Sequence, residues 1–98
     1  MAGDVQIKVE HQPDNNRFAA DVGGSLAVVE YMKVGNTLIF THTEVPEALE
    51  GQGIGGKLAK VALEYVRDNK MSAAPLCPFV KGYIKRHPEY KDLVRLGG

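Results

Sequence analysis

The sequence has little of several features that would assign a protein to a special class. It holds one cysteine, Cys77, so no disulfide can form within the chain. Its 12 basic and 12 acidic side chains cancel, which leaves no overall field to attract nucleic acid or an anionic membrane. No apolar run approaches the roughly 20 residues that span a bilayer, and the charged start of the chain does not resemble a signal peptide. We therefore expect a cytoplasmic protein that binds neither nucleic acid nor membrane.

The remaining composition is that of one small domain. Hydrophobic residues make up 44% and charged residues 24% of the 98 positions, which is ordinary for a soluble globular protein. No repeat, low-complexity segment or linker divides the chain. We expect a single domain over residues 1–98 with one small core and no metal site.

Apolar patterns in the first half predict an antiparallel meander. The alternation of apolar and polar residues is typical of strands. The longer run over residues 25–34 is apolar on both sides, which is typical of a strand in the centre of a sheet. Turn residues after His11 end the first strand, so we expect His11 at the surface. The predicted strands cover residues 5–10, 18–22, 25–34 and 37–45.

Helical spacing begins near residue 54. It predicts a long helix whose core face consists of Ile54, Leu58, Val61, Ala62 and Tyr65. Residues 71–76 predict a fifth strand, residues 79–86 a second helix preceded by Pro78, and residues 89–96 a last turn or short helix. The order β-β-β-β-α-β-α is that of an α+β fold, in which the long helix joins two strands that can lie parallel.

The segment between the fourth strand and the long helix is the strongest candidate for a binding site. Residues 50–58, which run from this segment into the start of the helix, contain four glycines, which allow positive φ and close approach of another molecule. The first amides of a helix have no partner within it and point outward. This loop therefore predicts a cradle for an anion, which we expect to be a phosphate group of a cofactor.

Two nucleotide-binding motifs match the loop only in part. Gly51, Gly53 and Gly56 satisfy G-x-G-x-x-G, but the rest of the chain is too short for the second β-α-β unit of a dinucleotide-binding fold. Gly51 to Lys57 matches most of a P-loop, but Leu58 stands where a hydroxyl should bind Mg²⁺.

Residues 50–55, Glu-Gly-Gln-Gly-Ile-Gly, resemble the cofactor signature Gln/Arg-x-x-Gly-x-Gly/Ala of the GNAT superfamily of acetyl-CoA-dependent N-acetyltransferases. Residues 76–79 and 86–88 resemble its very short, single-domain, NATD-like branch. Glu50 departs from the signature, which has Gln or Arg at this position. A carboxylate that faced the diphosphate would be unfavourable. The resemblance implies a GNAT-like fold and transfer of acetyl from acetyl-CoA to an amine of a small molecule or peptide, by a monomer or weak dimer. A non-catalytic module that binds acetyl-CoA or a protein is the alternative.

The resemblance also implies a set of cofactor-binding residues. The pyrophosphate would lie on the amides of the glycine loop, and the pantetheine arm would lie along the edge of the fourth strand like an added strand. Lys57 and Lys60 follow the loop and could reach a phosphate. The predicted cofactor-binding residues are Thr43, Glu44, Val45, Gly51, Gln52, Gly53, Ile54, Gly55, Gly56, Lys57 and Cys77.

Cys77 and His42 are the predicted catalytic residues. Cys77 precedes a predicted helix, whose first amides stabilise a thiolate. It could accept the acetyl group, protonate the departing CoA, or simply fill space. His42 is predicted to share a strand face with Phe40, where it could take a proton from the amine or pack against its neighbours. Glu44 is the alternative base.

Further polar residues follow in the second predicted helix and beyond it. Tyr83 and Tyr90 each offer a phenol that could protonate the CoA thiolate or pack on a helix surface. A basic cluster could contact the adenosine 3′-phosphate or remain solvated. Its members are Lys81, Lys85, Arg86 and His87.

Overall fold

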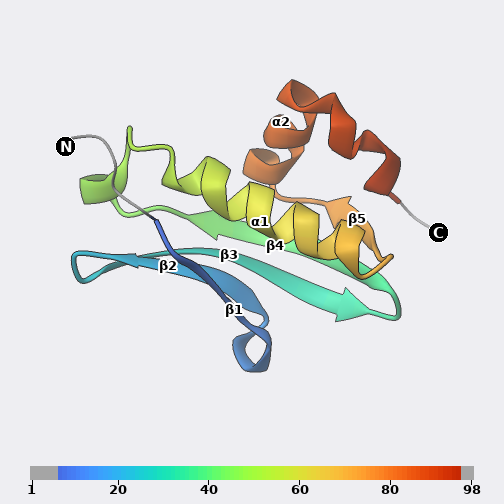
Figure 1. The fold of residues 1–98 in the computed structure, drawn as a ribbon, viewed down its shortest axis with the longest axis horizontal. Coiled ribbons are helices and arrows are strands. Elements are labelled where there is room, and N and C mark those ends of the chain that lie inside the picture. Colours follow the sequence, from blue (N-terminus) through green and yellow to red (C-terminus); the bar gives the residue numbers. More distant parts are fainter. Residues whose placement is uncertain (1–6, 96–98) are drawn as a thin grey trace.

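The computed structural model describes residues 7–95 of the chain. They form five strands and two helices (Figure 1): β1 (Val9–Gln12), β2 (Arg17–Val22), β3 (Ser25–Val34), β4 (Thr37–Glu44), α1 (Ile54–Asp68), β5 (Ser72–Pro75) and α2 (Pro78–Arg86). Three 3-10 turns complete the chain: η1 (Pro13–Asn15), η2 (Glu47–Leu49) and η3 (Pro88–Leu93). The predicted α+β fold and its order of elements are confirmed. Val5 and Leu96, at the ends of the predicted first strand and last turn, lie outside the described residues.

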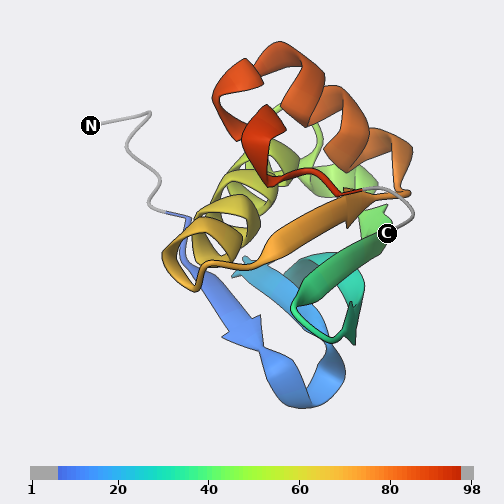
Figure 2. The same ribbon diagram turned by 90° about the vertical axis from the view of Figure 1, so that its right-hand side faces the viewer.

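The strands form one sheet in the order β1-β2-β3-β4-β5. The first four pair antiparallel and make the predicted meander, with β3 in the middle. After α1, β5 pairs parallel to β4. Apolar side chains from one sheet face join those of α1 and α2 in a single buried cluster, so both helices cover the same face (Figure 2). Between residues 7 and 95, no helix is both long and apolar enough to cross a membrane.

The predicted core residues Ile54, Leu58 and Ala62 of α1 are buried, but the centre of the buried face differs from the predicted one. Leu63 and Val66 are fully buried, whereas Val61 and Tyr65 are only partly buried. The prediction assumed a single partner surface, but α1 contacts α2 and η3 as well as the sheet. These additional contacts move the centre of the buried stripe toward Leu63.

The position predicted for His11 was wrong. The first strand runs from Val9 to Gln12 and does not include residues 7 and 8, which were predicted to belong to it. His11 is therefore the partner of Phe18 on β2. Its ring stacks on Phe18 with centroids 4.2 Å apart, and its Nε2 lies 2.6 Å from the hydroxyl of Tyr31. Burial lowers the pKa of His11 from its ordinary value of 6.5, which favours the neutral ring in this aromatic cluster.

The second face of β3 is less buried than its apolar sequence indicates. Leu26, Met32 and Val34 are exposed on that face, and only Val28 is buried near its middle. Residues 13–16, which connect β1 to β2, form a short 3-10 turn and no covering helix. The outer face of the sheet therefore stays uncovered by α1 and α2.

Candidate active site

The pairing between β4 and β5 ends halfway along β4. They pair only from Thr37 to Phe40, and the carbonyl of Phe40 then accepts bonds from the amides of Leu76 and Cys77, at 3.1 and 2.9 Å. The chain turns there into α2. The end of β4 extends beyond β5 with a free edge, and an extended molecule that carries amides can pair with such an edge.

A bulge changes which side chains of β4 face inward. Tyr31 on β3 is opposite Phe40, whereas the preceding Glu30 is opposite His42, so Thr41 is an extra residue on β4. An extra residue reverses the alternation of side chains beyond it. Thr43, and not His42, therefore continues the inner face of Phe40. The predicted shared face of His42 and Phe40 was wrong for this reason.

The glycine loop leads into α1 without a side-chain cap. Gly53 is the N-cap, with φ of 73° in the left-handed region, and no side chain accepts a hydrogen bond from the first turn. Lys57 is the first residue whose amide bonds within the helix, to the carbonyl of Gly53 at 3.0 Å. The amides of Ile54, Gly55 and Gly56 precede that bond, so their N–H groups are available to an anion.

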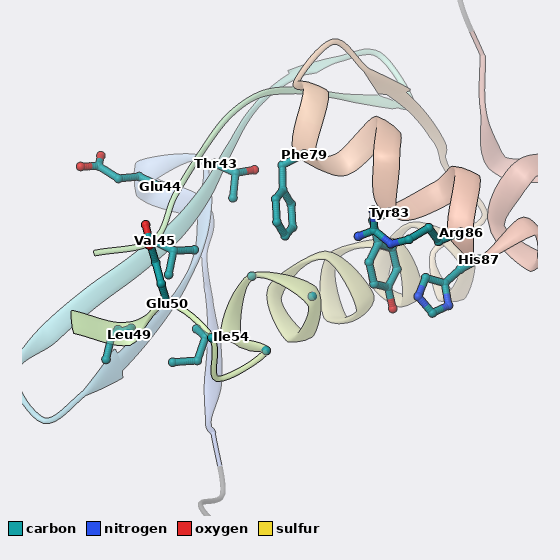
Figure 3. A pocket seen from close by; sticks show the side chains of 14 residues that line it. Thr43, Glu44, Val45, Leu49, Glu50, Ile54, Phe79, Tyr83, Arg86 and His87 are labelled. Atoms are coloured by element: carbon teal, nitrogen blue, oxygen red, sulfur yellow. The ribbon is translucent and has the colours of Figure 1, made fainter. Parts of the chain in front are cut away.

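One cavity of about 720 Å³ unites the glycine loop, the end of β4 and one face of α2. This volume is within the usual range for small-molecule sites. Its walls carry both apolar and charged side chains (Figure 3). The lining residues are Thr43, Glu44, Val45, Leu49, Glu50, Gly51, Gly53, Ile54, Gly55, Gly56, Phe79, Tyr83, Arg86 and His87.

Eight of the eleven predicted cofactor-binding residues line this cavity, and Gln52, Lys57 and Cys77 do not. The Gln52 side chain bonds back to the carbonyl of Ala48 at 3.4 Å. Lys57 lies with Lys60 in a separate groove between β1 and α1. Both lysines are turned away because the helix places them on the flank that faces β1.

Cys77 is adjacent to the cavity behind Thr43. The thiol is buried, with 4% of the residue exposed, and its Sγ lies 3.2 Å from the hydroxyl of Thr43. Thr43 itself lines the cavity. A proton on the thiol can thus be linked to the cavity through one hydroxyl group.

His42 lies outside the cavity and Glu44 lines it. The His42 side chain is exposed, and its Nε2 lies 3.6 Å from a carboxylate oxygen of Glu44. Of the two predicted bases, only Glu44 is on the cavity wall. His42 is a neighbour that can hold or exchange a proton with that carboxylate.

The two tyrosines that sequence patterns left equivalent have different surroundings. Tyr83 is buried and lines the cavity, and its hydroxyl points away from Thr43 in Figure 3. Burial is the main cause of its raised pKa, with Glu89 and Glu64 adding to it and Arg86 opposing it. Tyr90 donates its hydroxyl to Glu64 at 2.6 Å, away from the cavity.

Phe79 is a site residue that the sequence analysis missed. Its ring reaches from α2 toward the first turn of α1 (Figure 3). A Cβ atom on Gly55 would lie only 2.6 Å from Cζ of Phe79, so a larger residue there would require the Phe79 ring, which is 37% exposed, to move. The helical spacing of Phe79, Tyr83 and Arg86 was the available signal, since it predicts one stripe along α2.

We expect Gly55→Ala to lose most or all of the gain of about 1 kcal/mol that alanine has over glycine inside a helix, because the Phe79 ring must move to admit the new methyl group. In a Phe79→Ala background the same change should instead stabilise by up to about 1 kcal/mol, the usual gain of Ala over Gly inside a helix. Chemical denaturation measures both values.

Gly56→Ala is the matched control for this prediction. A Cβ there would meet Tyr83 at an ordinary contact distance of 3.6 Å, so no destabilisation is expected. Equal effects of Gly55→Ala and Gly56→Ala would contradict the packing role of Phe79.

Metal coordination finds no support in the geometry. Within the described part of the chain, no three His, Cys, Asp or Glu side chains gather closely enough to hold a metal ion. The chemistry available to the cavity is anion binding, hydrogen bonding and proton transfer.

Comparison with known proteins identifies relatives along nearly the whole chain. The family model described as GCN5-related N-acetyl-transferase matches residues 17–93. The protein NATD1 of Mus musculus is 37% identical over 93 residues, which is 92% of this chain and 84% of NATD1. The human NATD1 is 37% identical and covers 92% of this chain and 82% of its own length. NATD1 of Danio rerio is 34% identical over 94% of this chain and 86% of its own length.

A solved structure has the same fold. It is the solution NMR structure of a GCN5-like protein from Staphylococcus aureus, which is 31% identical in sequence. The two align with a TM-score of 0.68 over 97% of this chain and 91% of the other.

Proposed function

The chain belongs to the GCN5-related N-acetyltransferase family, and from this premise we propose that it is an acetyl-CoA-dependent enzyme that acetylates an amine of a small molecule or peptide. The observation that carries the proposal is the meeting of two unsatisfied backbone surfaces in one cavity. The uncapped first turn of α1 and the free edge of β4 both open into it. These surfaces suit the diphosphate and the amide-bearing arm of CoA.

The residues that would hold the cofactor follow from this arrangement. The amides of Ile54, Gly55 and Gly56 would donate to the diphosphate, and the edge of β4 at Thr43 to Val45 would orient the pantetheine arm. Acetyl-CoA supplies an activated thioester, whose acetyl group the acceptor amine takes.

Proton transfer is assigned to side chains at the β4 end of the cavity. The carboxylate of Glu44 can take a proton from the approaching amine, with His42 beside it. Cys77 holds a proton that Thr43 Oγ1 can pass to the departing thiolate. This assignment favours Cys77 as a proton donor over Cys77 as a nucleophile, because Thr43 stands between its sulfur and the cavity.

A module that binds CoA without turnover is the second candidate function. The exclusion of both predicted catalytic side chains, His42 and Cys77, from the cavity lining favours it. It shares the same cofactor site and differs only in the absence of chemistry.

Separate measurements of binding and turnover test the proposal. Acetyl-CoA at 100 times its dissociation constant should stabilise the fold by about 2.7 kcal/mol, seen as a higher melting temperature. Release of free CoA thiol with members of an amine panel should accompany this binding. Binding without release from any amine would favour the non-catalytic module, and no melting shift at millimolar acetyl-CoA would rule out both candidates.

A further inference from the structure

The charges of the cavity are separated along its length. Among its described lining residues, Glu44 and Glu50 carry negative charge, and only Arg86 carries a permanent positive charge. Figure 3 shows the two carboxylates at one end, and Arg86 with His87 at the other. Coulomb attraction and repulsion therefore draw the anionic part of any ligand toward Arg86.

The Arg86 side chain runs back along α2 toward the middle of the cavity (Figure 3). A Cβ atom on Gly82, one turn earlier, would lie 3.5 Å from Nη1 of Arg86. The neighbouring ring of Tyr83 packs against the first turn of α1, where a Cβ on Gly56 would lie 3.6 Å from Cε2. The guanidinium thus belongs to the wall that faces the uncapped turn.

Arg86 is also uncommitted to other described groups. Among residues 7–95 it forms no ion pair. By contrast, Arg67 pairs with Asp92 at 3.2 Å and Arg17 donates to the side chain of Gln12 at 2.7 Å. The guanidinium of Arg86 is therefore available for a ligand.

We propose that Arg86 is a second contact for the diphosphate of bound CoA, opposite the amides of the first turn of α1. This inference rests on the proposed function. A guanidinium forms two parallel hydrogen bonds to phosphate oxygens, which a lysine cannot reproduce. Arg86 thereby supplies a positive charge that Glu50, at the signature position of Gln or Arg, cannot supply. The diphosphate is then held between main-chain amides on one wall of the cavity and one side chain on the other.

Binding of three probes to wild-type protein and to Arg86→Gln tests the inference. The probes are CoA, dephospho-CoA and ADP, which share a diphosphate but differ in the 3′-phosphate and the pantetheine arm. We expect Arg86→Gln to weaken all three by a similar factor of about ten or more, the range for hydrogen bonds to charged groups. Arg86→Lys should give an intermediate loss. Titration monitored by backbone amide resonances measures each affinity.

Lys85→Gln is the matched control, because it makes the same change of charge at an exposed neighbour outside the cavity lining. It should leave all three affinities within about twofold, as expected for an exposed charge outside the site. Unchanged CoA affinity in Arg86→Gln would overturn the inference and leave the proposed function standing. A loss confined to CoA would overturn it in favour of a 3′-phosphate contact. Failure of the wild-type protein to bind CoA would overturn the proposed function itself, and the inference with it.

Discussion

Cys77→Ala should lower kcat by about 100-fold, the lower end of the contribution of a general acid, while the affinity for CoA stays the same. The thiol lies behind Thr43 and outside the cavity lining, so its loss removes no contact with the cofactor. Steady-state turnover and amide-resonance titration measure the two quantities separately.

Thr43→Val is the partner variant, because it removes the hydroxyl between Cys77 and the cavity and nearly keeps the volume. If the two residues act as a unit, each single change should cost about as much as the double variant. Cys77→Ser, which keeps a hydrogen-bonding group, should recover part of the rate.

The nucleophile alternative for Cys77 has its own observable. A proton donor leaves the thiol unmodified, so intact-protein mass spectra after incubation with acetyl-CoA should show no acetyl group on Cys77. Acetylated Cys77 that turns over with added amine would replace the proton-donor role by a covalent one. Unchanged kcat in Cys77→Ala would remove both roles.

Leu63→Ala should lower the free energy of unfolding by about 2–5 kcal/mol, the usual cost of truncating a buried leucine. Leu63 is fully buried, at 0% exposure, in the cluster that joins α1 to the sheet. Small domains have only about 5–15 kcal/mol of total stability, so this single change can remove a large share of it. Urea denaturation with an unchanged slope measures the loss.

Val61→Ala is the control for the orientation of α1. Val61 is partly buried at the edge of the cluster, and alanine is the better helix former. We expect a loss below about 1 kcal/mol. The sequence pattern had placed Val61 on the core face and had omitted Leu63. A larger loss for Val61→Ala than for Leu63→Ala would contradict the observed orientation of the helix.

The predictions that succeeded came from local patterns. Alternation of apolar residues located β2, β3 and β4 but only the first two residues of β1, and 3.6-residue spacing located α1. The uncapped start of α1 was also foreseen, because helix N-termini expose amides whatever the tertiary contacts are; binding of an anion there stays a prediction. The family model that matches residues 17–93 confirms the predicted family, and the solved structure of similar fold confirms the GNAT-like fold.

The predictions that failed concern which way a side chain faces. His42 was assigned to the inner face of β4, and the bulge at Thr41 reversed that assignment. His11 was expected at the surface, but β1 continues to pair with β2 beyond Glu10, which places His11 opposite Phe18. The position of a bulge and the end of a strand both depend on pairing with the neighbouring strand, and the sequence of one strand alone does not show that pairing.

By itself, the sequence determined the order of the elements, the glycine-rich entrance to α1 and the family of the protein. Only the tertiary structure decided that Phe79 packs on Gly55, that Thr43 links Cys77 to the cavity, and that Arg86 faces the uncapped turn. The physical reason is the range of the interactions. Backbone preferences and apolar periodicity act over a few neighbouring residues, whereas these contacts join β4, α1 and α2, which become neighbours only when the sheet and both helices have packed together.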